Sequence, residues 1–244
     1  MFHRILNFYT MARISHEQPT NESNVERLKP AKYYMTWDSG NKCLKYWDSD
    51  AVRGIEDEEE KKEKGNVQQH VPFKFSMFCE FSTIKGWHSD SNSRIYSNEV
   101  AYIGSQPVTV SSFDGGKLVE GIYSEIKPKV LSLGGKFHKS VYGVADNGTP
   151  INLAFKGSVV SAWSDFVKES GEEVYNKWIH IDSFKEMKKG NIEWTVPVFA
   201  LGKPFTAKEN EMIVSVSHDT KNALASRDAN KEAEAVLAQM DLSI

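Results

Sequence analysis

Hydrophobic positions in the middle of the chain mostly repeat with a period of two, which is typical of β-strands. The clearest case is residues 71–84, VPFKFSMFCEFSTI, where one side of the expected strand carries Phe73, Phe75, Met77 and Cys79. Residues 93–105 and 106–113 follow the same pattern. We therefore expect a strand-rich domain, with residues 82–100 forming a polar connection that begins and ends as strand.

Turn signals divide the remaining alternating segments into hairpins. Residues 31–50 flank a DSGN turn, residues 136–157 flank Asp146-Asn147-Gly148, and residues 174–202 flank a KKGN turn. Asp, Asn and Gly favour such turns because they tolerate the required backbone angles. These three segments predict three hairpins.

Two segments change to helical spacing. One expected helix carries an apolar stripe of Leu118, Ile122, Ile126, Val130 and Leu133, is closed by Gly134 and Gly135, and contains Pro128, which should kink it or begin a second segment. The other covers residues 158–170, with Ser158 as its N-cap and a stripe of Val159, Ala162, Trp163 and Phe166. Both helices are expected to pack on the strands.

The pattern indicates three parts: a flexible arm at residues 1–28, a core domain at 29–205, and a helical tail at 206–244. The tail is rich in alanine and in charged residues, and one face of its helix carries Ala233, Val236, Leu237 and Met240.

The core is predicted to be α+β and strand-rich. Short, bent antiparallel strands with two inserted helices suit a small barrel, and the oligonucleotide-binding (OB) barrel is one candidate among several α+β folds.

Charge and cysteine content narrow the functional classes. The formal net charge of −3 argues against a globally basic nucleic-acid binder, although it averages over different faces. Cys43 and Cys79 form no CxxC motif, which indicates a reducing, cytoplasmic compartment without disulfides or zinc. No apolar run is long enough for a transmembrane helix. The charged residues 55–66 predict a solvated loop or short helix, or alternatively an acidic mimic of nucleic acid.

The sequence contains no catalytic signature. The stretch SLGGKFHKS lacks the glycine spacing and the preceding strand of a phosphate-binding loop, but Lys136, His138 and Lys139 form a basic cluster that could contact phosphates. His180 and Asp182 lie on one side of an expected strand without further metal ligands nearby. We therefore predict no catalytic residues, no metal and no cofactor.

The connection at residues 82–100 contains a different kind of signal. Five tryptophans have apolar or strand neighbours, and most of them are expected in the core: Trp37, Trp47, Trp163, Trp178 and Trp194. In the connection, Lys85, Trp87, Arg94 and Tyr96 lie among serines and asparagines. Aromatic rings that stack on bases, next to cations that bind phosphates, hold single-stranded nucleic acid. The alternative is that Trp87 is buried and anchors the turn.

Four stretches in order, CEFSTIKGWHSDSNSRIYSNEV, EGIYSEIKPKVLSLGGKFHKSVYGV, NLAFKGSVVSAWSDFVKE and WTVPVFALG, resemble phage-encoded single-stranded DNA-binding proteins. The resemblance covers roughly residues 70–202. It implies an OB barrel that binds single-stranded DNA in phage replication or recombination within the bacterial host cell. It assigns no individual contact residue. The acidic C-terminal tip of many such proteins is absent, because AQMDLSI holds only Asp241 as a side-chain acid.

Three hypotheses follow from these observations. The first is a non-enzymatic protein that binds single-stranded DNA through Lys85, Trp87, Arg94 and Tyr96, with Lys136, His138 and Lys139 as secondary phosphate contacts. The second is a protein-interaction or inhibitor module that uses the acidic run and the tail helix. The third is a nuclease-like enzyme with dispersed residues. Replication or recombination proteins are expected partners of the tail helix, and a homodimer through a free strand edge is a further expectation.

Overall fold

The computed structural model describes residues 29–113 and 115–241, with side chains described as far as Arg227. The arm predicted at residues 1–28 and the helix face predicted at Ala233, Val236, Leu237 and Met240 lie outside this description. The strands are β1 (Tyr33–Asp38), β2 (Cys43–Trp47), β3 (Asn66–His70), β4 (Phe73–His88), β5 (Ser93–Ser97), β6 (Val108–Ser112), β7 (Lys117–Gly121), β8 (Gly135–Ala145), β9 (Pro150–Lys156), β10 (Lys177–Lys189) and β11 (Ile192–Pro204). The helices are α1 (Glu58–Gly65), α2 (Tyr123–Ser132), α3 (Ser158–Ser170) and α4 (Ala207–Asp241), with a 3₁₀ turn η1 (Gly171–Tyr175).

These strands form one large mixed sheet that is not closed. The main path runs β3-β2-β1-β9-β8-β4-β5-β6-β7, and the β10–β11 hairpin joins it through the pairing of β10 with β4. The predicted α+β, strand-rich class is confirmed. The sheet is mixed and not wholly antiparallel, because β1 runs parallel to β9.

Strand β4 connects the different parts of this sheet. Its beginning pairs with β10, its length with β8, and its end with β5. A register shift between Met77 and Cys79 interrupts its alternation. The predicted common face of Met77 and Cys79 is therefore wrong: Met77 packs in one core cluster, whereas Cys79 joins Phe78 in another.

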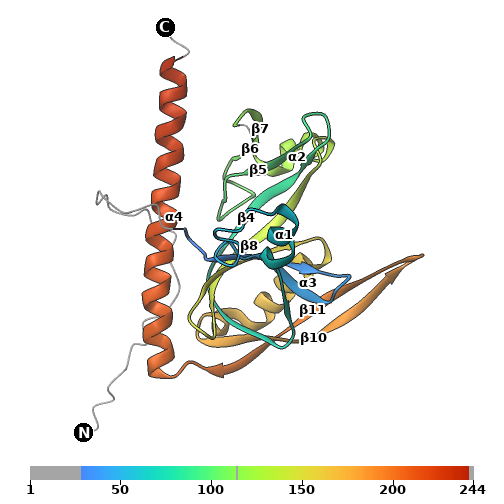
Figure 1. Ribbon diagram of the computed structural model, residues 1–244, viewed down its shortest axis with the longest axis vertical. Helices are drawn as coiled ribbons and strands as arrows, with labels where there is room; N and C mark the ends of the chain where they lie inside the picture. Colours follow the sequence, from blue (N-terminus) through green and yellow to red (C-terminus); the bar gives the residue numbers. More distant parts are fainter. Residues whose placement is uncertain (1–28, 114, 242–244) are drawn as a thin grey trace.

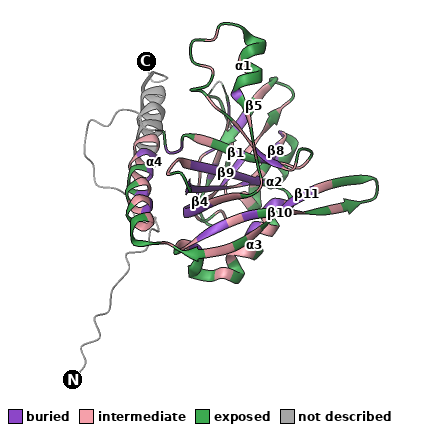
Figure 2. Cartoon of the chain, turned by 60° about the horizontal axis from the view of Figure 1, so that its bottom comes forward, coloured by how far each residue is buried: buried purple, intermediate pink, exposed green. Residues whose placement is uncertain are grey.

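Three apolar clusters hold the layers together. The largest lies between α3 and the face of the sheet that α3 covers, called the inner face, around Phe75, Val141 and Trp163. A second lies between the outer face of the sheet and α4, and a third lies under α2. Figure 2 shows the buried segments concentrated in β4, β8 and β9, and the exposed far end of the β10–β11 hairpin. The opposite face, which α4 covers, is called the outer face.

The tail helix α4 extends along one side of the molecule (Figure 1). Its first part packs on the outer face of the sheet, where Ile213, Ala223 and Leu224 are buried. A tail helix was predicted, but the depth of this burial was not. Among the described residues, no helix combines the length and apolar character that crossing a membrane requires.

Several local predictions need correction. The helix expected from Leu118 begins only at Tyr123, because β7 occupies Lys117–Gly121 and Gly121 takes a φ of 153° that breaks regular structure. Leu118 still packs beneath α2, but from a strand. Pro128 lies within α2 and does not divide it, and the helix ends, as predicted, before Gly134, whose φ is 81°.

The tryptophans mostly follow the expectation. Trp37, Trp163 and Trp178 are buried, and Trp194 is half-buried. Trp47 is the exception, since its side chain is exposed and its ring lies against the backbone of Gly65 at the end of α1. The charged run thus forms the short helix α1, whose last residue, Gly65, contacts the exposed ring of Trp47.

Candidate nucleic-acid interface

The segment at residues 82–100 is mostly strand. The predicted polar connection begins and ends as strand, as expected, but it is much shorter: β4 continues to His88, β5 begins at Ser93, and the four residues Ser89 to Asn92 form the turn. The Nδ1 atom of His88 lies 2.7 Å from the Ser91 hydroxyl. The four residues singled out in this segment are consequently held by a regular antiparallel ladder.

This ladder brings the four side chains to one face. Lys85 pairs with Tyr96, and Trp87 pairs with Arg94. Directly paired residues of an antiparallel ladder project to the same side, and residues two apart on a strand do so as well. Lys85, Trp87, Arg94 and Tyr96 therefore share the outer face.

The opposite face of the same hairpin packs under α2. Ile84 and Ile95 are fully buried there together with Val130 of the helix. Trp87, in contrast, is 50% exposed and Tyr96 is 37% exposed. The structure thus places Trp87 on the solvent side and outside the core. Phe113, which follows β6 and donates its backbone N–H to Arg94, is 68% exposed.

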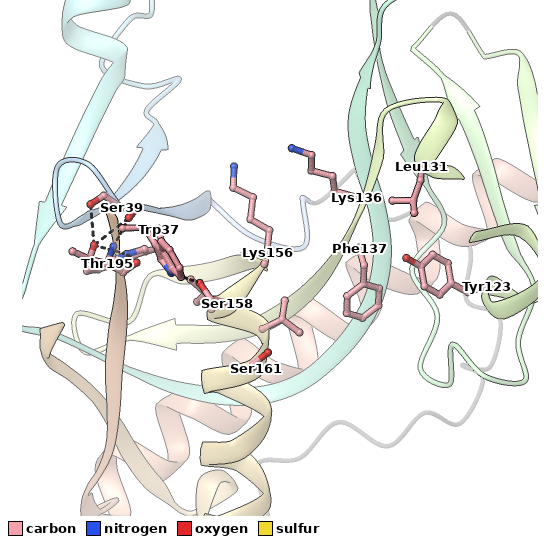
Figure 3. A pocket seen from close by; sticks show the side chains of 14 residues that line it. Trp37, Ser39, Tyr123, Leu131, Lys136, Phe137, Lys156, Ser158, Ser161 and Thr195 are labelled. Carbon is pink, nitrogen blue, oxygen red and sulfur yellow. Dashed lines mark hydrogen bonds between the residues drawn. The ribbon is translucent and has the colours of Figure 1, made fainter. Parts of the chain in front are cut away.

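The neighbouring strands bring further cations to this face. Lys136 on β8 pairs with Lys85, and Lys156 at the end of β9 pairs with His138, two residues after Lys136. Both lysines line the same pocket, and Figure 3 shows their ammonium groups at its rim. We call the set of Lys85, Trp87, Arg94, Tyr96, Phe113, Lys136 and Lys156 the basic face.

The cations of the basic face make no ion pair with a carboxylate among the described side chains. Within residues 29–113 and 115–227, no ion pair involves Lys85, Arg94, Lys136 or Lys156. Burial lowers the pKa of Lys85, because a half-buried ammonium loses part of its hydration. Four like charges without acids between them repel one another, so this surface favours an anionic ligand.

The other two residues of the predicted basic cluster behave differently. Lys139 projects to the inner face, where its Nζ atom lies 2.7 Å from Oε1 of Glu80, which also accepts a hydrogen bond from Trp163. His138 lies on the outer face but is buried, and burial lowers its pKa to about 4. Neither residue is available as a cation at neutral pH, because one is paired and the other is uncharged.

A groove of about 560 Å³ adjoins the basic face at Lys136 and Lys156. Its walls carry aromatic side chains from separate elements: Trp37 of β1, Tyr123 of α2, Phe137 of β8 and Trp194 of β11. Figure 3 shows the first three of these rings. Trp37 and Trp194 are held in place, since their Nε1 atoms each lie 3.0 Å from an acceptor, the Thr195 carbonyl and the Ser158 hydroxyl. The groove therefore combines fixed rings with two unpaired lysines.

Ser158 differs from its predicted role. The N-cap of α3 is Gly157, and Ser158 is the first helical residue, whose hydroxyl accepts a hydrogen bond from Trp194.

Lys156 and Phe113 are members of the basic face that the sequence did not indicate. Each stands alone at a strand end, so only the pairing of distant strands connects it to Lys85 and Arg94.

Two further features raised other possibilities: the His180 and Asp182 pair suggested a metal or catalytic site, and the acidic run suggested a mimic of nucleic acid. His180 Nδ1 and Asp182 Oδ1 are 3.7 Å apart, which is too long for a hydrogen bond. Among the described residues, no group of three His, Cys, Asp or Glu side chains could hold a metal ion. In α1, Glu58, Glu59 and Glu60 pair with lysines of the same helix. Because these carboxylates are paired with lysines, the acidic run is poorly suited to imitate the phosphates of a nucleic acid.

Comparison with models of known protein families, with curated proteins and with solved structures returns no match. The resemblance to phage single-stranded DNA-binding proteins therefore stays a prediction.

Proposed function

We propose that this protein binds single-stranded DNA without sequence preference and without enzymatic chemistry. The observation that carries the proposal is the basic face, where the exposed rings of Trp87, Tyr96 and Phe113 lie among four cations that make no ion pair within residues 29–113 and 115–227. Single-stranded DNA presents bases that stack on rings and phosphates that bind cations, so it matches both properties of this surface.

The chain order of the strands supports a diverged OB barrel. A meander of β4, β8 and β9 is followed by α3 and then by the β10–β11 hairpin, which returns to pair with β4. These are five strands, and an OB barrel is likewise a five-stranded, partly open barrel. In this proposal β1 and β2 are additions that lie beside β9, where they keep the sheet open.

The groove lies where this interpretation expects a ligand. OB barrels bind oligonucleotides over the second and third strands, between the loops that join strands one to two and four to five. The matching elements here are β8 with Lys136, β9 with Lys156, the α2 segment with Tyr123, and β11 with Trp194. We propose that the strand crosses from the groove to Trp87 with its phosphates on the lysines.

The proposed binding has a defined energetic signature. Each stacked base contributes about 1–3 kcal/mol. Each neutralised phosphate releases counterions, so that the logarithm of affinity falls with the logarithm of salt concentration by about 0.7 per contact. Four cations thus predict a slope near −3, with little dependence on base identity.

Fluorescence anisotropy of labelled oligo-dT, titrated with protein at several salt concentrations, tests this proposal. We expect salt-sensitive binding, weaker binding of a duplex of equal length, and an intact oligonucleotide with or without magnesium. Absence of salt-sensitive binding at low ionic strength would overturn the proposal. Magnesium-dependent loss of the oligonucleotide would favour the nuclease hypothesis, and copurification of a protein without nucleic acid would favour the interaction module.

The proposed biological setting is phage DNA replication or recombination. It is based on the resemblance described above and on the sequence-tolerant chemistry of the basic face. An assay of strand annealing or strand protection with this protein would test the setting separately from binding.

A further inference from the structure

A buried carboxylate lies at the edge of the basic face. Glu99 follows β5, next to the two backbone hydrogen bonds that join Ser82 and Val100. Its side chain is 9% exposed and accepts hydrogen bonds from the Ser140 hydroxyl, from Tyr142 at 2.9 Å and from Arg227 at 2.8 Å. Arg227 lies on α4, so this carboxylate joins the tail helix to the sheet.

Lys85 lies within the electrostatic reach of the same carboxylate. The isolated bridge between Ser82 and Val100 lies one residue out of register with the β4–β5 ladder, and its register places Glu99 opposite Thr83, two positions along the strand from Lys85. Long side chains bridge such diagonal neighbours in an antiparallel sheet. The pKa of Lys85 reflects this proximity, because Glu99 raises it and Arg227 lowers it.

A buried carboxylate requires a cationic partner, since an unpaired charge is costly inside a protein. Arg227 meets this requirement, and Lys85 makes no ion pair within the described residues. Lys85 is the cation of the basic face on which the charge of Glu99 acts, so it is the candidate to replace Arg227. Pairing with Glu99 would remove its charge from the surface that faces the ligand.

We infer that Arg227 is a positioning residue for the DNA-binding surface: by occupying Glu99, it keeps Lys85 free to bind phosphate. This inference rests on the proposed function. It also gives the docked part of α4 a role in binding, because the helix delivers Arg227 to Glu99 while Ile213 and Leu224 hold it on the sheet.

Four proteins test the inference: wild type, Arg227→Ala, Glu99→Gln and the double variant. We expect Arg227→Ala to weaken oligo-dT binding roughly tenfold, the loss of one charged contact, and to reduce the salt slope by about 0.7. The double variant should regain both the affinity and the slope, because no carboxylate competes for Lys85. Glu99→Gln alone should bind at least as tightly as wild type.

The double variant separates positioning from simple docking of the helix. Both proteins that lack Arg227 lose the same contact between α4 and the sheet, but the double variant also removes the unpaired buried carboxylate. Urea unfolding of all four proteins therefore accompanies the titrations, because a merely structural role would make affinity follow the free energy of unfolding. Equal weakness of the two, or unchanged affinity of Arg227→Ala, would overturn the inference while leaving the proposed function intact. Failure of the wild-type protein to bind would instead refute the proposed function.

A measurement without DNA addresses the same geometry. Acylation of Lys85, followed by mass spectrometry, should slow in Arg227→Ala, because a lysine paired with a carboxylate holds its proton more tightly. The rate should return in the double variant. Unchanged acylation in Arg227→Ala would show that Lys85 does not replace Arg227 and would overturn the inference independently of any binding result.

Discussion

Lys136 and Lys139 lie three residues apart on β8, carry the same charge, and face opposite sides of the sheet. Lys139 reaches the inner face and is held by Glu80 under α3, whereas Lys136 is exposed on the outer face and makes no ion pair with the described side chains of residues 29–113 and 115–227. A lysine that is paired in the interior stabilises the fold, while one that is unpaired at the surface is available to a ligand. The two faces therefore give the same residue type different roles.

The largest expected effect concerns the outer face. Reversal of two of its charges in Lys136→Glu/Lys156→Glu should weaken oligo-dT binding roughly a thousandfold, because two phosphate contacts are lost and two repulsions are added. Anisotropy at low salt measures the change. Lys168→Glu, a reversal of an exposed lysine on α3, is the matched control and should bind much more tightly than the double variant. Similar affinities of the two would remove the distinction between the faces.

His138 sharpens the comparison, since it lies on the outer face but is buried. Its pKa is about 4 in the folded protein and about 6.5 in the unfolded chain. The unfolded chain therefore binds more protons as the pH falls below 6.5, and stability decreases toward pH 4. By pH 4.5 the loss should be roughly 2 to 3 kcal/mol.

Urea unfolding at pH 7 and pH 4.5 measures this dependence. Carboxylates also titrate in this range, so the informative quantity is the difference between wild type and His138→Gln, which retains the carboxylates and lacks the imidazole. An equal loss of stability in both proteins would contradict the buried, neutral state of His138.

Substitution of the exposed ring tests stacking on the outer face. Trp87→Ala should weaken binding by about 2 kcal/mol, and Trp87→Phe by less, because a smaller ring still stacks. The free energy of unfolding should change little, since the side chain is half exposed. Trp47→Ala, which removes another exposed tryptophan away from the basic face, should leave binding unchanged. Unchanged affinity of Trp87→Ala would refute stacking at this residue.

The smallest expected effect concerns the inner face. Lys139→Ala should lower the free energy of unfolding by about 1.5 kcal/mol, because it leaves Glu80 without its cation in a mostly buried site. The affinity for oligo-dT should not change. Lys136→Ala should show the reverse pattern, with weaker binding and unchanged stability. Denaturant unfolding and anisotropy measure both variants. Weaker binding of Lys139→Ala, or lower stability of Lys136→Ala, would contradict the different roles of the two faces.

Local signals in the sequence were reliable where a few neighbouring residues decide the outcome. The Asp146-Asn147-Gly148 turn, the end of α2 before Gly134, and the alternating start of β4 all have such local causes. The errors arose where a distant segment intervenes. The bulge after Met77 moved Cys79 to the other face, and the pairing of β6 with β7 made a strand of the expected first helical turn.

The candidate site shows the same division. Lys85, Trp87, Arg94, Tyr96 and Lys136 were indicated by composition, and the structure brings them to one face. Lys156 and Phe113 were missed, because nothing in their own neighbourhoods marks them. Arg227 is more than a hundred residues from Glu99 in the chain, so its contact follows only from the docking of α4.

By itself, the sequence determined the strand-rich class, most turns and helices, and the residue types that a nucleic-acid surface would need. These properties depend on side-chain periodicity and backbone preference, which act over a few residues. Only the tertiary structure decided which side of the sheet each cation faces and whether an acid neutralises it. That outcome depends on strand register and on helix docking, because both bring together residues that are far apart in the chain.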